Sequence, residues 1–298
     1  MIRNIIFVYL AWCLASFGIY LSGYLVPAQG GLYLPLVLLS MAAALFAALG
    51  LLRFYAKRVE PAIGDRHLFR IFLLAITLAV FFSVYAFEAV TGLTYDMLAV
   101  IATANLLFFA SILGFWMVFP LKRPAEIMPL CLVAALADMI SVTAGPTKEF
   151  SDSLAAYYTG GEVGLPPFVD FLLVKIAIPG QLMPVFGISD WVIVVFLSAA
   201  AWKFGMDDAL VRPARQSAAG NWRFWLTFPV SCAGLILALL LAKVSGAFIP
   251  ALPFVAIVFL AVMMHRYPKM RRLTSAEIIP MLVFSAVMTG LILWRVTL

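Results

Sequence analysis

Three acidic residues lie within stretches of otherwise apolar sequence: Glu88, Asp138 and Asp190. Most of the other acidic residues lie in loops or at the ends of apolar segments. A carboxylate at membrane depth costs several kcal/mol unless it is protonated, paired or exposed to water, so such residues are candidates for function. Glu88 lies near the end of its segment, where its side chain can reach the lipid headgroups. Asp138 and Asp190 are therefore the stronger candidates.

Asp138 lies close to the end of one apolar segment, and Asp190 lies close to the beginning of the next. If the first segment runs outward and the second inward as helices, both carboxylates come roughly one to two turns below the same surface. Two adjacent carboxylates cannot both ionise cheaply, so they share a proton and titrate as a pair. Aspartic proteases use this arrangement, in which one acid activates water and the other protonates the substrate. The residues alone also allow a proton-coupled transport site, or two unrelated buried acids bonded to backbone or to serine and threonine.

The composition indicates which elements position these acids. The chain has 298 residues, of which 65% are hydrophobic and 11% charged, whereas about 25% are charged in soluble domains. A helix needs about 20 apolar residues to cross a bilayer. The sequence therefore predicts an all-α, polytopic membrane bundle of about nine transmembrane helices, at residues 4–26, 33–53, 69–91, 97–119, 126–144, 186–203, 222–243, 247–264 and 275–297.

The basic residues indicate the orientation of these predicted helices. Lysine and arginine concentrate in the even-numbered loops, at Arg53, Lys57, Arg58, Arg66, Arg70, Lys122, Arg123, Lys203, Arg212, Arg215, Arg223, Arg266, Lys269, Arg271 and Arg272. Because cytoplasmic loops carry the excess of lysine and arginine, the N-terminus is predicted in the cytoplasm and the C-terminus outside. We expect a four-span scaffold at 1–120 and a five-span catalytic region at 121–298, in a prokaryotic plasma membrane.

Other chemistries find little support in the sequence. The three cysteines, Cys13, Cys131 and Cys232, lie in apolar stretches without metal-ligand spacing. The net charge of +6 follows from membrane topology, so no nucleic-acid partner is expected. We expect neither a metal nor an organic cofactor, and the lipid bilayer as the surrounding partner. The sequence does not indicate an oligomeric state.

Three motifs occur in order along the chain: Asp138 in LADMISVTAGP, Asp190 in GISD, and Pro250-Ala251-Leu252. Together they resemble the intramembrane aspartyl proteases of the presenilin and signal peptide peptidase family. That family has an aspartate on one helix, a second in Gly-x-Gly-Asp on the next, and a later Pro-Ala-Leu. The wording LMPVFGISDWVIVVFLSAAAWKFG at 182–205 is most similar to the signal peptide peptidase branch. The resemblance covers roughly residues 126–264.

The resemblance implies roles for particular residues. Asp138 and Asp190 would form the catalytic dyad that activates water to cleave transmembrane peptide substrates. Gly187 would allow close helix approach, Ser189 would keep the site small, and the Pro-Ala-Leu segment would pack near the dyad. The segment containing Val174, Lys175 and Ile176 would pair with unwound substrate as an added strand; otherwise it is a buried loop.

The chain also departs from the family pattern. Ala137 stands where the family has tyrosine, Ser189 replaces the second glycine, and one further span follows Pro-Ala-Leu. Tyr95-Asp96 reproduces a Tyr-Asp dipeptide, but it lies in a short outer loop without a partner aspartate. Two alternatives therefore stay open: a proton-coupled transporter or channel that uses the same acids, and an inactive relative that binds helices. Prepilin peptidases share a Gly-x-Gly-Asp signature, but the Pro-Ala-Leu span and the lack of a cytoplasmic cysteine cluster argue against that class.

Overall fold

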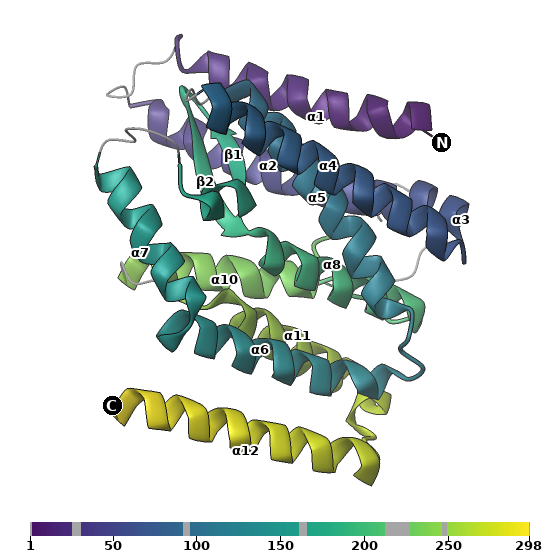
Figure 1. Cartoon of the computed structure of the whole chain (residues 1–298). Helices are drawn as coiled ribbons and strands as arrows, with labels where there is room; N and C mark the ends of the chain where they lie inside the picture. Colours follow the sequence, from purple (N-terminus) through teal and green to yellow (C-terminus); the bar gives the residue numbers. More distant parts are fainter. Residues whose placement is uncertain are drawn as a thin grey trace. The chain divides into compact units, whose positions relative to one another are not determined.

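A computed structural model describes residues 2–25, 31–91, 96–160, 166–211, 227–245 and 249–297, and these are mostly helical (Figure 1). Tyr95, Arg212, Arg215 and Arg223 lie outside this part of the chain. The helices are α1 (Ile2–Ser22), α2 (Tyr33–Phe54), α3 (Glu60–Ile63), α4 (His67–Thr91), α5 (Asp96–Val118), α6 (Ile127–Ala144), α7 (Pro146–Thr159), α8 (Ile188–Lys203), α10 (Val230–Ser245), α11 (Ala251–Arg266) and α12 (Ser275–Thr297). The strands are β1 (Leu173–Ile178) and β2 (Gln181–Gly187).

Five helical segments of the described chain are long and apolar enough to cross a membrane: Arg3–Ser22, Tyr33–Ile63, His67–Thr91, Asp96–Val118 and Pro124–Val142. Each is 19 residues or longer, and a helix needs about 20 predominantly apolar residues to cross a bilayer. A mostly helical protein with several helices compatible with a membrane is therefore confirmed.

A β-hairpin departs from the all-α prediction. β1 pairs antiparallel with β2, and the connecting Pro179-Gly180 has the sequence of a type II turn. Gly180 has a φ of +81°, which favours glycine because a Cβ would be strained there. Phe186 and Gly187, predicted to begin the sixth span, end β2 instead. Helix α8 then begins at Ile188.

The chain divides into two compact units. The first comprises Met1–Leu113 and Ala156–Trp191, and the second comprises Gly114–Ala155 and Val192–Leu298. Asp190 and the hairpin therefore belong with the N-terminal helices, although the sequence placed them in the region 121–298. In the first unit the hairpin packs against α1 and α2, and in the second unit α6 packs against both α11 and α12 (Figure 1).

Aromatic side chains fix the segment that precedes the hairpin. This segment is a short 3-10 helix, Phe168–Leu172. The Tyr85 ring of α4 lies edge-on to Phe168, with centroids 5.3 Å apart, and to Phe171, at 5.0 Å. Such edge-to-face pairs add about 0.5–1.5 kcal/mol beyond the area they bury. They hold the entrance of the hairpin against α4.

In the second unit, α10 and α11 cross at a glycine. A Cβ on Gly234 would lie 2.5 Å from Val255 Cα and 2.8 Å from the Phe254 carbonyl oxygen. Both neighbours are backbone atoms, so neither can give way by a rotamer change. Gly234 thus sets how closely α10 approaches the first turns of α11, where the Pro-Ala-Leu segment lies.

Candidate functional site

Asp138 lies on α6 and is half-buried. Its Oδ2 accepts a hydrogen bond of 3.1 Å from the backbone N–H of Leu252. Leu252 is the second residue of α11, and the first amides of a helix have no partner within the helix. Pro250 precedes the helix in an extended conformation, with φ −62° and ψ 126°. The Pro-Ala-Leu turn therefore presents a free amide, and the positive end of a helix dipole, to the Asp138 carboxylate.

Asp190 is the third residue of α8. Its Oδ2 accepts a hydrogen bond of 3.1 Å from the backbone N–H of Gly187, which directly precedes the helix. This contact is the carboxylate half of a capping box, and it suits an acid in the first turn of a helix. Asp190 is half-buried and Ser189 beside it is exposed.

Gly187 leaves space beside the Asp190 carboxylate. A Cβ at this position would meet Ser189 Oγ at 3.4 Å and Asp190 Oδ2 at 3.5 Å. These are ordinary van der Waals distances, so a side chain would fill the volume next to the carboxylate without forcing the backbone to move. A glycine here keeps one side of the carboxylate accessible.

The two candidate acids belong to different units, Asp138 to the second and Asp190 to the first. Each unit gives the local geometry of its own acid. In both units a carboxylate is held by a backbone amide at the beginning of a helix. The pairing of the two acids stays a prediction.

Val174, Lys175 and Ile176 form the first half of β1. Val174 and Ile176 are buried, at 1% and 4% exposure. One edge of β1 pairs with β2, and on the other side the Lys175 N–H donates to Thr103 Oγ1 of α5 at 3.2 Å. β1 is thus the more buried of the two strands, while β2 is exposed or half-buried at every residue except Phe186.

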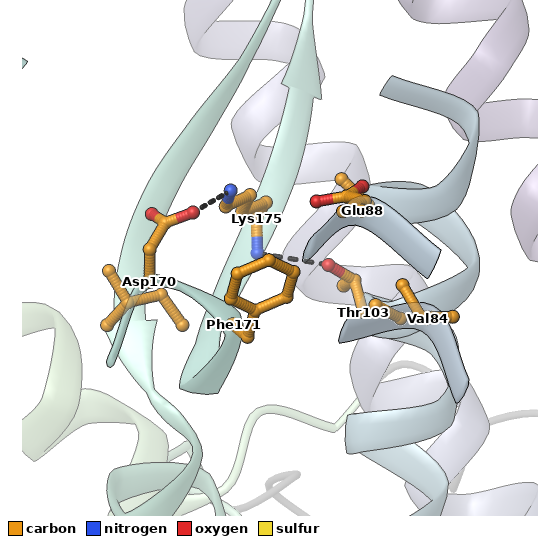
Figure 2. A pocket seen from close by; sticks show the side chains of 9 residues that line it. Val84, Glu88, Thr103, Asp170, Phe171 and Lys175 are labelled. Carbon is orange, nitrogen blue, oxygen red and sulfur yellow. Dashed lines mark hydrogen bonds and ion pairs between the residues drawn. The ribbon is translucent and has the colours of Figure 1, made fainter. Parts of the chain in front are cut away.

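A buried charge cluster that the sequence did not indicate lies beside β1 (Figure 2). Lys175 Nζ forms an ion pair with Asp170 Oδ2, and the Tyr158 hydroxyl donates to Asp170 Oδ1 at 2.6 Å. Asp170 and Lys175 line a small cavity together with Glu88 and Thr103. The cavity measures about 20 Å³, which is room for about one water molecule.

Glu88 differs from its sequence-based interpretation. The side chain was predicted to reach the headgroups, but only 4% of the residue is exposed, and it faces the cavity next to Lys175 (Figure 2). The sequence signals for this cluster were weak, because Asp170 and Lys175 lie in a stretch predicted as a loop. Their placement depends on α4 and α5, which are distant in sequence, and on α7.

A further buried acid, Asp208, follows α8 in the second unit and is 6% exposed. The Trp202 indole N–H donates to its Oδ1 at 3.0 Å. Its Oδ2 is buried without a hydrogen-bond partner among the described residues. Burial raises the pKa of Asp208 to about 6, although the Trp202 hydrogen bond acts in the opposite direction.

No cluster of three or more His, Cys, Asp or Glu side chains in the described ranges is arranged to hold a metal ion. No family model, curated protein or solved structure matches this chain. The interpretation of the site therefore rests on the geometry of the residues themselves.

Proposed function

We propose that this protein is an intramembrane aspartyl endopeptidase in which Asp138 and Asp190 form the catalytic dyad. The observation that carries the proposal is the hydrogen bond from the Leu252 amide to Asp138. It joins the first aspartate to the Pro-Ala-Leu segment across 114 residues of sequence. Both are motifs that resemble those of presenilins and signal peptide peptidases, and their direct contact supports a shared site.

The chemistry needs one ionised and one protonated carboxylate. The ionised carboxylate takes a proton from water as the water oxygen bonds to the scissile carbonyl carbon, and the protonated one donates its proton to the carbonyl oxygen. Collapse of the tetrahedral diol then breaks the C–N bond: the ionised acid takes a proton from one diol hydroxyl and the protonated acid gives its proton to the leaving nitrogen, which restores the starting dyad. During these transfers the amides of Leu252 and Gly187 stay hydrogen-bonded to the two acids and keep them in place. The amide protons themselves are not transferred.

The substrate is an unwound stretch of a transmembrane peptide, because a scissile carbonyl must be free of helical hydrogen bonds. The substrate would bind as an extended strand added to β2, since β2 is more exposed than β1 and runs directly into α8. A substrate strand added to β2 would lie close to Asp190, three residues beyond the end of the strand. Pro184 of β2 lacks an N–H, as is tolerated at a sheet edge.

The proposed topology has about nine spans, with the N-terminus in the cytoplasm and the C-terminus outside, in a prokaryotic plasma membrane. The alternation of basic and non-basic loops supports this orientation. The five helical segments long enough to cross a membrane support the multi-pass character.

The proposal is tested with Asp138→Asn and Asp190→Asn, each purified and assayed on a single-span model substrate. We expect cleavage to fall by at least about 1,000-fold in both variants, because neither step of the proton transfer can proceed with one acid. Asp152→Asn is the matched control, since Asp152 is an exposed acid on α7 and its loss should leave cleavage unchanged. Undiminished cleavage in either dyad variant would contradict the proposal.

A proton-coupled transporter or channel is the second candidate, because the buried cluster of Glu88, Asp170 and Lys175 places ionisable groups beside the apolar helix α4. That function predicts pH-driven flux in proteoliposomes that Glu88→Gln abolishes, with no peptide cleavage. The protease predicts cleavage without flux. An inactive helix-binding relative would show neither flux nor cleavage.

A further inference from the structure

The hairpin and the second candidate acid form one continuous segment. β2 ends at Gly187 and α8 begins at Ile188, so Asp190 lies in the first turn after the strand. Any movement of the hairpin is transmitted to the beginning of α8 without an intervening loop. The contacts that hold the hairpin therefore also determine where Asp190 lies.

The hairpin has a weak point near its middle. The pairing register shifts between Val174 and Lys175, which marks a bulge or irregularity. Lys175 lies opposite Pro184 and Val174 lies opposite Phe186, so Val185 of β2 is the extra residue at this irregularity. A bulge leaves a residue unpaired and disrupts the ladder locally. Pairing between the strands is therefore poorest at Lys175.

Three other elements hold the chain at this weak point. The Lys175 N–H donates to Thr103 Oγ1 of α5, and its ammonium forms an ion pair with Asp170 (Figure 2). The second carboxylate oxygen of Asp170 accepts the Tyr158 hydroxyl of α7. Asp170 is only 1% exposed, and removing one partner of a buried ion pair leaves an uncompensated charge, which is strongly destabilising.

The turn of the hairpin is held separately. The Gly180 N–H donates to the Tyr20 carbonyl of α1 at 3.0 Å. A Cβ on Gly23 would lie 2.0 Å from Gly180 N, so the two backbones touch at this point. With the turn fixed, the irregularity opposite Lys175 is the place where the hairpin would otherwise bend.

We propose that Thr103, Asp170 and Tyr158 are positioning residues that act through Lys175. They hold β1 opposite the irregularity of β2, so that the edge of β2 and the carboxylate of Asp190 keep the arrangement needed for cleavage. The inference rests on the proposed protease function. It assigns a role in that reaction to a charge cluster that the proposed proton transfers do not themselves use.

The first test is Thr103→Val, which removes the acceptor hydroxyl and keeps the side-chain shape. We expect kcat for a single-span substrate to fall about tenfold, the equivalent of one lost hydrogen bond, while KM changes less than about twofold. Amide hydrogen exchange should become faster across 173–187. Thr103→Ser, which keeps the hydroxyl, should restore both measurements.

Thr77→Val is the matched control. Thr77 is a buried threonine of α4, and its hydroxyl donates to the Leu74 carbonyl of its own helix. This variant should retain wild-type kcat and wild-type exchange in the hairpin. Tyr158→Phe gives an independent second variant, and it should accelerate exchange in the same segment and lower kcat.

Wild-type kcat and wild-type hairpin exchange in both Thr103→Val and Tyr158→Phe would overturn the inference. If Asp138→Asn and Asp190→Asn abolish cleavage while these two variants cleave normally, the positioning role fails and the protease stands. If the dyad variants still cleave, the proposed function fails. Unchanged hairpin exchange in that case would overturn the anchoring role as well.

Discussion

At the scale of single residues, the surroundings of three aspartates distinguish candidate catalytic acids from an anchor. Asp138 and Asp190 each accept a backbone amide at the beginning of a helix. An amide orients a carboxylate without supplying a full opposite charge, so the group stays able to exchange protons. Both carboxylate oxygens of Asp170 are instead taken by Lys175 and Tyr158. The first two environments suit acid–base chemistry, and the third suits an anchor.

Asp208 allows a pH prediction. Its pKa of about 6 lies above the value of about 3.9 for an unperturbed aspartate, so the folded protein binds this proton more tightly than the unfolded chain does. Its contribution to stability should therefore be greatest below about pH 4, decrease up to about pH 6, and stay constant above that.

Asp208→Asn tests this prediction, because the amide resembles the protonated acid and does not titrate. We expect the thermal midpoint of the variant, relative to wild type, to be higher at pH 7.5 than at pH 4.5. Both proteins are measured in the same detergent by the same unfolding assay. An equal difference at the two pH values would show that Asp208 titrates normally.

At the scale of elements, the crossing of α10 and α11 should control the position of the Pro-Ala-Leu turn. Gly234→Ala would bring a methyl group into contact with the backbone at Val255. Overpacking of this kind costs about 1–3 kcal/mol. We expect a lower thermal midpoint and reduced cleavage, because Leu252 and its amide move with the first turns of α11.

Gly290→Ala is the matched control, since a Cβ on Gly290 of α12 would meet no atom within 4 Å. It should leave cleavage unchanged and slightly raise stability, because alanine favours the helix by about 1 kcal/mol. A Gly234→Ala protein with the stability and activity of wild type would contradict the close crossing.

The apolar helices were the part of the fold most readily predicted from the sequence. The predicted segment 69–91 corresponds to α4 (His67–Thr91), and 97–119 corresponds to α5 (Asp96–Val118). Hydropathy and length determine such helices locally. The hairpin and α7 were not predicted, because both lie in a stretch of mixed polarity. β1 is held by Thr103 of α5 and, through Asp170, by Tyr158 of α7. Its geometry therefore depends on contacts with other elements.

The candidate site, like the fold, was predicted only in part from the sequence. Composition singled out Asp138 and Asp190, because acids in apolar segments are rare and costly. The Leu252 contact was suggested only by the resemblance of the motifs. The pairing of Asp170 with Lys175 and Tyr158 left no distinctive pattern in the sequence, because three separate elements bring these side chains together.

At the scale of the whole molecule, the proposed reaction needs one acid from each compact unit. The first unit contributes Asp190 at the end of the hairpin, and the second contributes Asp138 beside the Pro-Ala-Leu turn.

Cross-linking across the dyad tests this central claim most directly. The three native cysteines are replaced by alanine, cysteines are introduced by Asp138→Cys and Asp190→Cys, and a short bifunctional thiol reagent is applied to membranes. The account predicts an efficient intramolecular cross-link, seen as one peptide joining 138 to 190 by mass spectrometry. The control pair Asp65→Cys with Asp190→Cys should cross-link far less, because Asp65 lies in an exposed basic loop that is proposed on the opposite side of the membrane from Asp190. Absence of the 138–190 product, with both thiols shown to be reactive, would contradict the dyad.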